Sequence, residues 1–189
     1  MEALDDTILD AIAAQVRAHP PLQQETVIEL LGEAHREPRG PAEATLIRHH
    51  LGVALDGALA RRDRGLDVGD LYQEGSVAVV TAVEEYAARA GDAAGLRAYV
   101  KRIVDLHLDA ALEREQEAKR SEEALVRDSR LLEAAQLELV HRLGREPTTV
   151  ELAAFLEWTA ERVDTLWAML AEARAINDVT LLPYLDDLE

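Results

Sequence analysis

The segment Asp70-Leu71-Tyr72-Gln73-Glu74-Gly75 places two carboxylates and an amide within a few residues, just before an apolar series at helical spacing. Carboxylates and amides at a helix start can pair with Arg and Lys side chains of a partner helix. A purely structural interpretation is also open: Asp70 fits a helix N-cap, Gln73 fits the third helical position, and Gly75 would allow another helix to pack closely. The segment is therefore either the beginning of a helix or a surface that another protein binds.

Catalytic and metal-binding patterns are absent from the sequence. His49 and His50 are adjacent, so on a helix they point about 100° apart. Glu138 and His141 have the spacing of one half of a di-iron motif, but such sites need two copies and two further Glu, so a solvated helix face explains them better. The chain has no cysteine, and it has no phosphate loop, nucleophile elbow or HExxH motif. We expect no enzyme, no metal and no cofactor.

Charge is distributed unevenly along the 189 residues, whose formal net charge is −17. Residues 1–45 carry nine acids and three bases, and residues 146–189 carry ten acids and two bases. Residues 46–145 hold the other 15 bases against 18 acids. Because phosphate binding needs clustered Lys and Arg, strong autonomous DNA binding is excluded, whereas a weak or partner-assisted contact from the central part is not.

The elements that position these residues are all expected to be helices, since Ala, Leu and Glu are abundant and aromatic residues make up only 4%. Apolar periodicity and breakers predict helices over about 5–18, 23–35, 42–62, 70–86, 96–118 and 122–143, then a helix-turn-helix after Gly144. Thr148 and Glu151 have capping-box spacing at its start. The last residues, from Asn177, show no clear periodicity and are expected to be extended.

In this order the motifs resemble the sigma-70 family of bacterial transcription initiation factors. DLYQEG followed by an apolar helix resembles the family's region 2.2, and LGREPTTVELAAFL resembles its region 3 signature. The residues from Pro21 to Leu55 resemble, more weakly, regions 1.2 and 2.1. The resemblance implies region 1.2-like helices in 1–40, a region 2-like helical bundle in 41–120, a small three-helix region 3-like domain in 121–177, and an acidic extended tail, the start of a region 3.2-like linker, in 178–189.

The family's region 2.2 binds the clamp coiled coil of the largest subunit of core RNA polymerase. Carried over, the resemblance makes Asp70, Gln73 and Glu74 the polymerase-binding residues. It also implies a bacterial, cytoplasmic protein, and no run of residues approaches the length of a membrane span.

The promoter-melting segment of the family aligns with LRAYVKRIVDLHL, residues 96–108, and here it departs from the housekeeping pattern. Four residues are the DNA-binding candidates: Arg97, Tyr99, Lys101 and Arg102. Tyr99 would stack on an unpaired base while the cations hold phosphate. The alternative is that Tyr99 is a core residue packed with Ile103 and Leu106.

The resemblance favours an initiation factor that binds core polymerase and contributes to promoter recognition or opening. No segment corresponding to region 4 follows in this sequence, so we expect that this chain does not read two promoter boxes alone. The alternative is a sigma-derived regulator, a decoy, an anti-sigma-like protein or a helper, that binds polymerase without opening promoters. Promoter DNA would be bound weakly or only within the polymerase complex.

Overall fold

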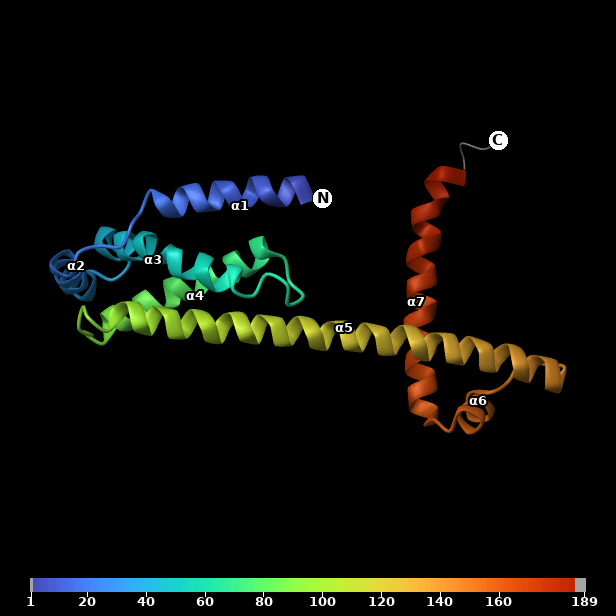
Figure 1. Cartoon of the computed structure of the whole chain (residues 1–189). Helices are drawn as coiled ribbons and strands as arrows, with labels where there is room; N and C mark the ends of the chain where they lie inside the picture. The colour runs from blue at the N-terminus through green and yellow to red at the C-terminus, as the bar shows by residue number, and fades with distance from the viewer. Residues whose placement is uncertain (1, 186–189) are drawn as a thin grey trace. The chain divides into compact units, whose positions relative to one another are not determined.

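The computed structural model describes the backbone of residues 2–185 and the side chains of residues 9–172. Within that part the chain forms seven α-helices and no strand, so the all-α prediction is confirmed (Figure 1). The helices are α1 (Glu2–Arg17), α2 (Gln24–Arg36), α3 (Pro41–Leu59), α4 (Val68–Ala88), α5 (Leu96–Leu143), α6 (Thr149–Leu156) and α7 (Ala160–Leu185).

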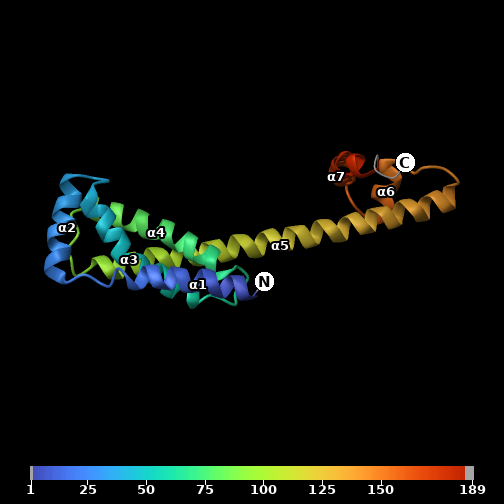
Figure 2. The same ribbon diagram turned by 90° about the horizontal axis from the view of Figure 1, so that it is seen from above.

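The chain divides into two compact units, Met1–Ala118 and Lys119–Glu189. We call them unit 1 and unit 2. Helix α5 contributes residues to both units. Unit 1 contains α1 to α4 and the first part of α5. Helices α1, α3, α4 and this part of α5 lie side by side, and α2 runs across one end of them (Figures 1 and 2).

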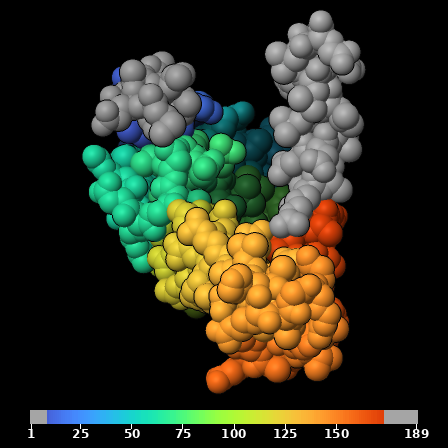
Figure 3. Space-filling model, turned by 90° about the vertical axis from the view of Figure 1, so that its right-hand side faces the viewer, coloured from blue at the N-terminus to red at the C-terminus, as the bar shows by residue number. Residues whose placement is uncertain are grey.

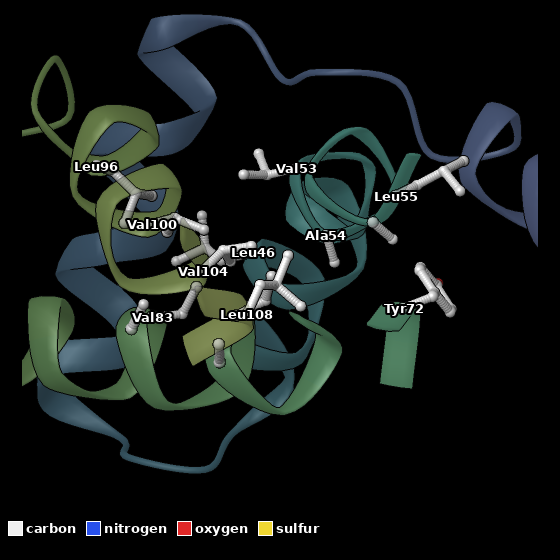
Figure 4. Packing of buried hydrophobic residues seen from close by; sticks show 14 of the residues in the cluster. Leu46, Val53, Ala54, Leu55, Tyr72, Val83, Leu96, Val100, Val104 and Leu108 are labelled. Carbon is white, nitrogen blue, oxygen red and sulfur yellow. The ribbon is translucent and has the colours of Figure 1, made fainter. Parts of the chain in front are cut away.

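The core of unit 1 forms where α3, α4 and the first half of α5 meet. Val100, Val104 and Leu108 recur every four residues along α5 and are fully buried, which is the spacing of one helix face. In Figure 4 these side chains point toward those of α3 and α4, including Leu46 and Val83. Burying a Val or Leu side chain contributes roughly 1.5–3 kcal/mol, so this three-helix contact is the main source of stability in unit 1.

Local sequence sets most helix ends in unit 1. Helix α1 ends at Arg17, shortly before Pro20 and Pro21, which cannot continue a helix. Helix α3 begins with Pro41 at its first position, where the missing N–H costs nothing. Partly buried side chains of α1, among them Ile12 and Val16, pack against the core of unit 1.

Unit 2 has a smaller core, built by the end of α5 together with α6 and α7. Among the residues whose side chains the structure describes, seven buried ones form this core: Leu132, Ala135, Leu139, Leu152, Ala153, Val163 and Leu166. The tight turn between α6 and α7 passes through Glu157, which takes a left-handed conformation with φ 56°. The predicted helix-turn-helix is confirmed.

The predictions for the middle of α5 and for the end of α7 are wrong. Residues 118–122 join the two helices predicted from Leu96 to Leu143 into the single 48-residue helix α5; this stretch, AKRSE, contains neither Gly nor Pro, so nothing interrupts the hydrogen bonding. Residues 178–185, predicted to be extended, continue α7, because no Gly or Pro precedes Pro183 in this helix. Residues 186–189 of the predicted tail lie outside the described part. None of the described helices is long and apolar enough to cross a bilayer.

Candidate functional site

The start of α4 is capped by Asp67, whose carboxylate Oδ1 accepts a hydrogen bond from the Gly69 N–H at 2.6 Å. The prediction that Asp70 is the N-cap is therefore wrong. Asp67 and Asp70 both have a suitable side chain, and the helix begins one turn earlier than the sequence pattern indicated. Asp70 lies instead in the first turn, where a carboxylate interacts favourably with the positive end of the helix dipole.

The structure brings Asp70, Gln73 and Glu74 together on one face of the first two turns of α4. They are three and four residues apart, so their side chains are neighbours. Asp70 and Gln73 are exposed, and Glu74 is partly exposed. This part of α4, with the loop before it, reaches the surface in the green region of Figure 3. The face can offer two carboxylates and one amide to a partner.

Glu74 has an intramolecular partner that the sequence did not indicate. Its carboxylate Oε2 lies 3.4 Å from Nη2 of Arg114 on α5. The two residues are 40 positions apart, so no local pattern could have revealed the pair. Val77 follows on the same face of α4 and is 62% exposed; in the sequence it was indistinguishable from the apolar residues of the buried face.

The opposite face of the same segment holds α4 against α3. Leu71 is fully buried, and Tyr72 is 9% exposed. A Cβ added at Gly75 would lie 3.1 Å from the Cβ of Ala54, so the glycine permits the close approach that the structural interpretation predicted. Close packing on the inner face and an exposed polar outer face therefore coexist in this segment.

The four DNA-binding candidates lie at the start of α5, and not all of their side chains are available to DNA. Arg97 and Arg102 are exposed. Lys101 is exposed as well, but its Nζ lies 2.6 Å from Oδ2 of Asp105. Tyr99 lies at the edge of the core of unit 1. All three cations of the segment are thus exposed, and Lys101 also pairs with Asp105.

Tyr99 is held by a group of side chains at the end of α4. Its hydroxyl donates to Oε2 of Glu85 at 2.6 Å, and its ring centroid lies 5.1 Å from that of Tyr86. The guanidinium of Arg89 lies 5.5 Å from the centre of the Tyr99 ring. Hydrogen bonding to Glu85, with some desolvation, raises the pKa of the Tyr99 hydroxyl. The ring is therefore already in contact with aromatic and cationic neighbours.

Of the two core neighbours predicted for Tyr99, one is confirmed and one is wrong. Ile103 packs against the core as Tyr99 does, whereas Leu106 is 57% exposed, so placing Leu106 in the core was wrong. An i+7 residue on a helix is rotated by about 20° from the reference position, and at the edge of the core this rotation leaves Leu106 outside.

Asp105 and Asp109, which make the second half of this segment acidic, anchor α5 to the turn that follows α3. Arg61, whose side chain is 11% exposed, lies 3.1 Å from Asp105 and 2.9 Å from Asp109. Hydrogen bonding to Arg61 lowers the pKa of Asp109, and the same bond raises the pKa of Arg61. The ion pairs with Arg61 therefore explain why acidic residues occur in a segment whose first half carries the DNA-binding candidates.

Unit 2 begins its helix-turn-helix with a fully formed capping box. The Glu151 N–H donates to Oγ1 of Thr148 at 3.3 Å, and the Thr148 N–H donates to Oε2 of Glu151 at 2.8 Å. Arg145 adds a two-pronged contact to the Glu151 carboxylate at 2.9 and 2.6 Å. The predicted capping box is confirmed, and Arg145 gives the arginine of the Gly-Arg-Glu-Pro stretch a structural role.

No group of three or more His, Asp or Glu side chains is placed to hold a metal ion in the part of the chain that the structure describes. The observed geometry offers surfaces for macromolecular contact: the outer face of α4 in unit 1, the start of α5, and the helix-turn-helix of unit 2.

Comparison with protein families supports the interpretation of unit 2. Residues 128–177 match the family model for sigma-70 region 3, and the chain matches none of the curated proteins with which it was compared. The match covers the end of α5, α6 and the first part of α7. For residues 21–120 the resemblance to regions 1.2 and 2 rests on the motifs alone. The chain thus contains a sigma-70 region 3 domain, a domain of transcription initiation factors, at residues 128–177.

Proposed function

We propose that this protein is a sigma-70-type transcription initiation factor that binds core RNA polymerase and contributes to promoter recognition or opening. The region 3 domain at residues 128–177 is the observation that carries the proposal. We propose that it acts by binding, without catalysis of its own, and that it does so in the bacterial cytoplasm, as the family resemblance implies.

The polymerase contact is proposed to be the exposed face of α4 formed by Asp70, Gln73 and Glu74. The clamp coiled coil of the largest subunit of polymerase would supply Arg and Lys side chains to the two carboxylates, as charge-assisted hydrogen bonds. Support comes from the exposure of Asp70 and Gln73 and from the buried inner face of the same turns, which fixes the outer face in position.

The DNA contact is proposed to be weaker and to form only within the polymerase complex. Arg97 and Arg102 would hold phosphate, with Lys101 and Tyr99 contributing after they leave Asp105 and Glu85. The net charge of −17 opposes the approach of the free protein to DNA.

A second candidate function follows from these same partners of Lys101 and Tyr99. If Lys101 stays paired with Asp105 and Tyr99 stays bonded to Glu85 on polymerase, neither is available to DNA. The protein then occupies the clamp without opening promoters, as a sigma-derived decoy, anti-sigma-like regulator or helper. The specific observation in its favour is that Tyr99, the only aromatic residue of the segment, already donates to Glu85, and that Lys101 already makes a surface pair with Asp105.

A run-off transcription assay with core enzyme and a fork-junction template separates the two candidates. An initiation factor yields product that depends on this chain. A decoy or anti-sigma-like regulator yields none, but it reduces the product that another sigma factor makes with the same core enzyme, whereas a helper yields none alone and increases that product. A protein that neither yields product nor changes the product of another sigma factor would contradict both candidates.

A further inference from the structure

A groove with a volume of about 450 Å³ lies in unit 1 between α2 and the turn that follows α4. Both views show α2 and this turn at the same end of unit 1 (Figures 1 and 2). Ile28, Leu31 and Gly32 form the wall from α2, and small residues from Ala90 to Ala94 form much of the other wall. The lining is largely apolar, although water can reach it.

Ile28 exposes an aliphatic side chain in this groove without contributing to the buried core. It is 56% exposed, whereas Leu31 beside it is 6% exposed and belongs to the core. Gly32, one turn after Ile28, leaves open space: a Cβ added there would meet no other heavy atom within 4 Å. The groove thus has an exposed aliphatic side chain and room beside it for a side chain from elsewhere.

Charge around the groove favours a cationic occupant. Glu25 and Glu29 are exposed on the next row of α2, and Asp92 lines the opposite wall. The basic residues nearby already have partners within unit 1. His35 Nδ1 is 2.9 Å from the Ala87 carbonyl oxygen, and Arg36 Nε donates to the Gly32 carbonyl at 3.0 Å. Arg89, directly after α4, pairs with Glu85 at 3.1 Å.

The end of α4 adds to this negative potential. Helix α4 ends at Ala88, beside the groove, and the C-terminal end of a helix carries partial negative charge. Phosphate groups of a nucleic acid would be repelled by the helix end and the three carboxylates. A partner helix could bury an aliphatic side chain in the groove, and Lys or Arg beside that side chain would be attracted by the carboxylates around the groove.

We infer that this groove binds an amphipathic helix of a partner protein, with one aliphatic side chain packed against Ile28 and Gly32 and with Lys or Arg facing Glu25, Glu29 and Asp92. The groove lies at the end of α4, about 25 Å along the helix axis from Asp70 and Glu74. It is therefore separate from the proposed polymerase contact, and the inference goes beyond the proposed function.

The test uses the full chain and a synthetic helical peptide that carries one Leu with Lys at the positions three and four residues away. Binding is followed by amide NMR shifts and by fluorescence anisotropy. We expect saturable shifts at Ile28, Gly32 and residues 90–94. Replacing the Leu of the peptide by Asp should weaken binding at least tenfold.

Two substitutions of the same glycine provide matched variants. Gly32→Leu fills the groove, and because the position is helical and open it should fold as well as the native chain. It should weaken peptide binding at least tenfold, whereas Gly32→Ala should leave binding within about twofold, as expected for an added methyl group without a clash. Both variants should bind core polymerase as the native chain does, so failure of this inference is distinguishable from failure of the proposed function.

Three outcomes would overturn the inference. One is peptide binding that Gly32→Leu does not weaken, and another is the absence of shifts at the groove at saturating peptide. The third is a single-stranded DNA oligonucleotide that produces these groove shifts while the peptide does not, since the groove would then be a nucleic-acid site.

Discussion

The carboxylate of Glu74 on α4 lies 3.4 Å from the guanidinium of Arg114 on α5. The side chains are 44% and 62% exposed, and exposed pairs of this kind contribute only about 0–1 kcal/mol to stability. The pair therefore contributes little to folding. Its main effect is on the charge of the α4 face, because Arg114 neutralises one of the two carboxylates proposed to meet polymerase.

Arg114→Ala should tighten binding to core polymerase, because Glu74 is then available to the partner without competition. The free energy of unfolding should change by less than about 1 kcal/mol. Binding is measured by titration of labelled core enzyme, and unfolding by urea. Arg62→Ala is the control, since Arg62 is similarly exposed at 64%. Weaker polymerase binding by Arg114→Ala would show that Arg114 itself contacts the partner.

Tyr99→Phe and Tyr99→Ala separate the hydroxyl of Tyr99 from its ring. Loss of the hydrogen bond to Glu85 should cost about 0.5–1.5 kcal/mol. Loss of the ring contacts with Tyr86 and Arg89 as well should raise the cost to about 1–3 kcal/mol. Thermal and urea unfolding measure both values.

The ring would instead be a base-stacking platform if Tyr99→Ala left stability unchanged and abolished promoter opening in the polymerase complex. A destabilised Tyr99→Ala protein whose folded fraction opens DNA normally would remove the stacking role.

Gly75→Val should destabilise unit 1 by about 1–3 kcal/mol, because the added atoms press on Ala54 of α3 and overpack the contact between α3 and α4. Gly32→Ala is the matched control on α2, where an added Cβ has open space; it should stabilise the protein by up to about 1 kcal/mol through helix propensity. Equal effects in urea unfolding would show that α3 and α4 are not closely packed at Gly75.

The start of α6 should lose stability at low pH, over a pH range set by the pKa of Glu151. Hydrogen bonds from Arg145, then from Thr148, lower the pKa of Glu151 from 4.5 to about 2. Because the pKa of the folded state is the lower one, the stabilisation is complete above pH 4.5 and is lost as the pH falls toward about 2. The ¹³C shift of the Glu151 carboxyl measures the midpoint, which Arg145→Ala should raise. A midpoint near 4.5 in the native chain would contradict the observed contacts.

The sequence was sufficient to predict the elements whose signals are local. Periodic apolar residues identified the helices, and the spacing of Thr148 and Glu151 identified the capping box. The N-cap of α4 was misplaced because Asp67 and Asp70 have equally suitable side chains, and only the backbone geometry shows that Asp67 is used. The helix itself was therefore predicted correctly, but its cap was placed one turn too late.

Contacts between distant segments were beyond the reach of the sequence. Nothing near Asp105 indicates that it binds Arg61, 44 residues earlier, and nothing near Tyr99 indicates the hydroxyl partner Glu85. These contacts decide whether a charged or aromatic side chain is available to DNA. The candidate residues could therefore be named from the motif, while their availability depends on the packing of α3, α4 and α5.

Co-elution with core RNA polymerase tests the central claim most directly. The native chain should co-elute, and Asp70→Lys with Glu74→Lys should abolish co-elution while helicity by circular dichroism stays unchanged, because reversing two charges at a contact costs several kcal/mol, on the order of 2–5. Glu25→Lys with Glu29→Lys makes the same change in net charge on α2 and should still co-elute. Undiminished binding by the Asp70 and Glu74 double variant would contradict the assignment of this face of α4 to polymerase.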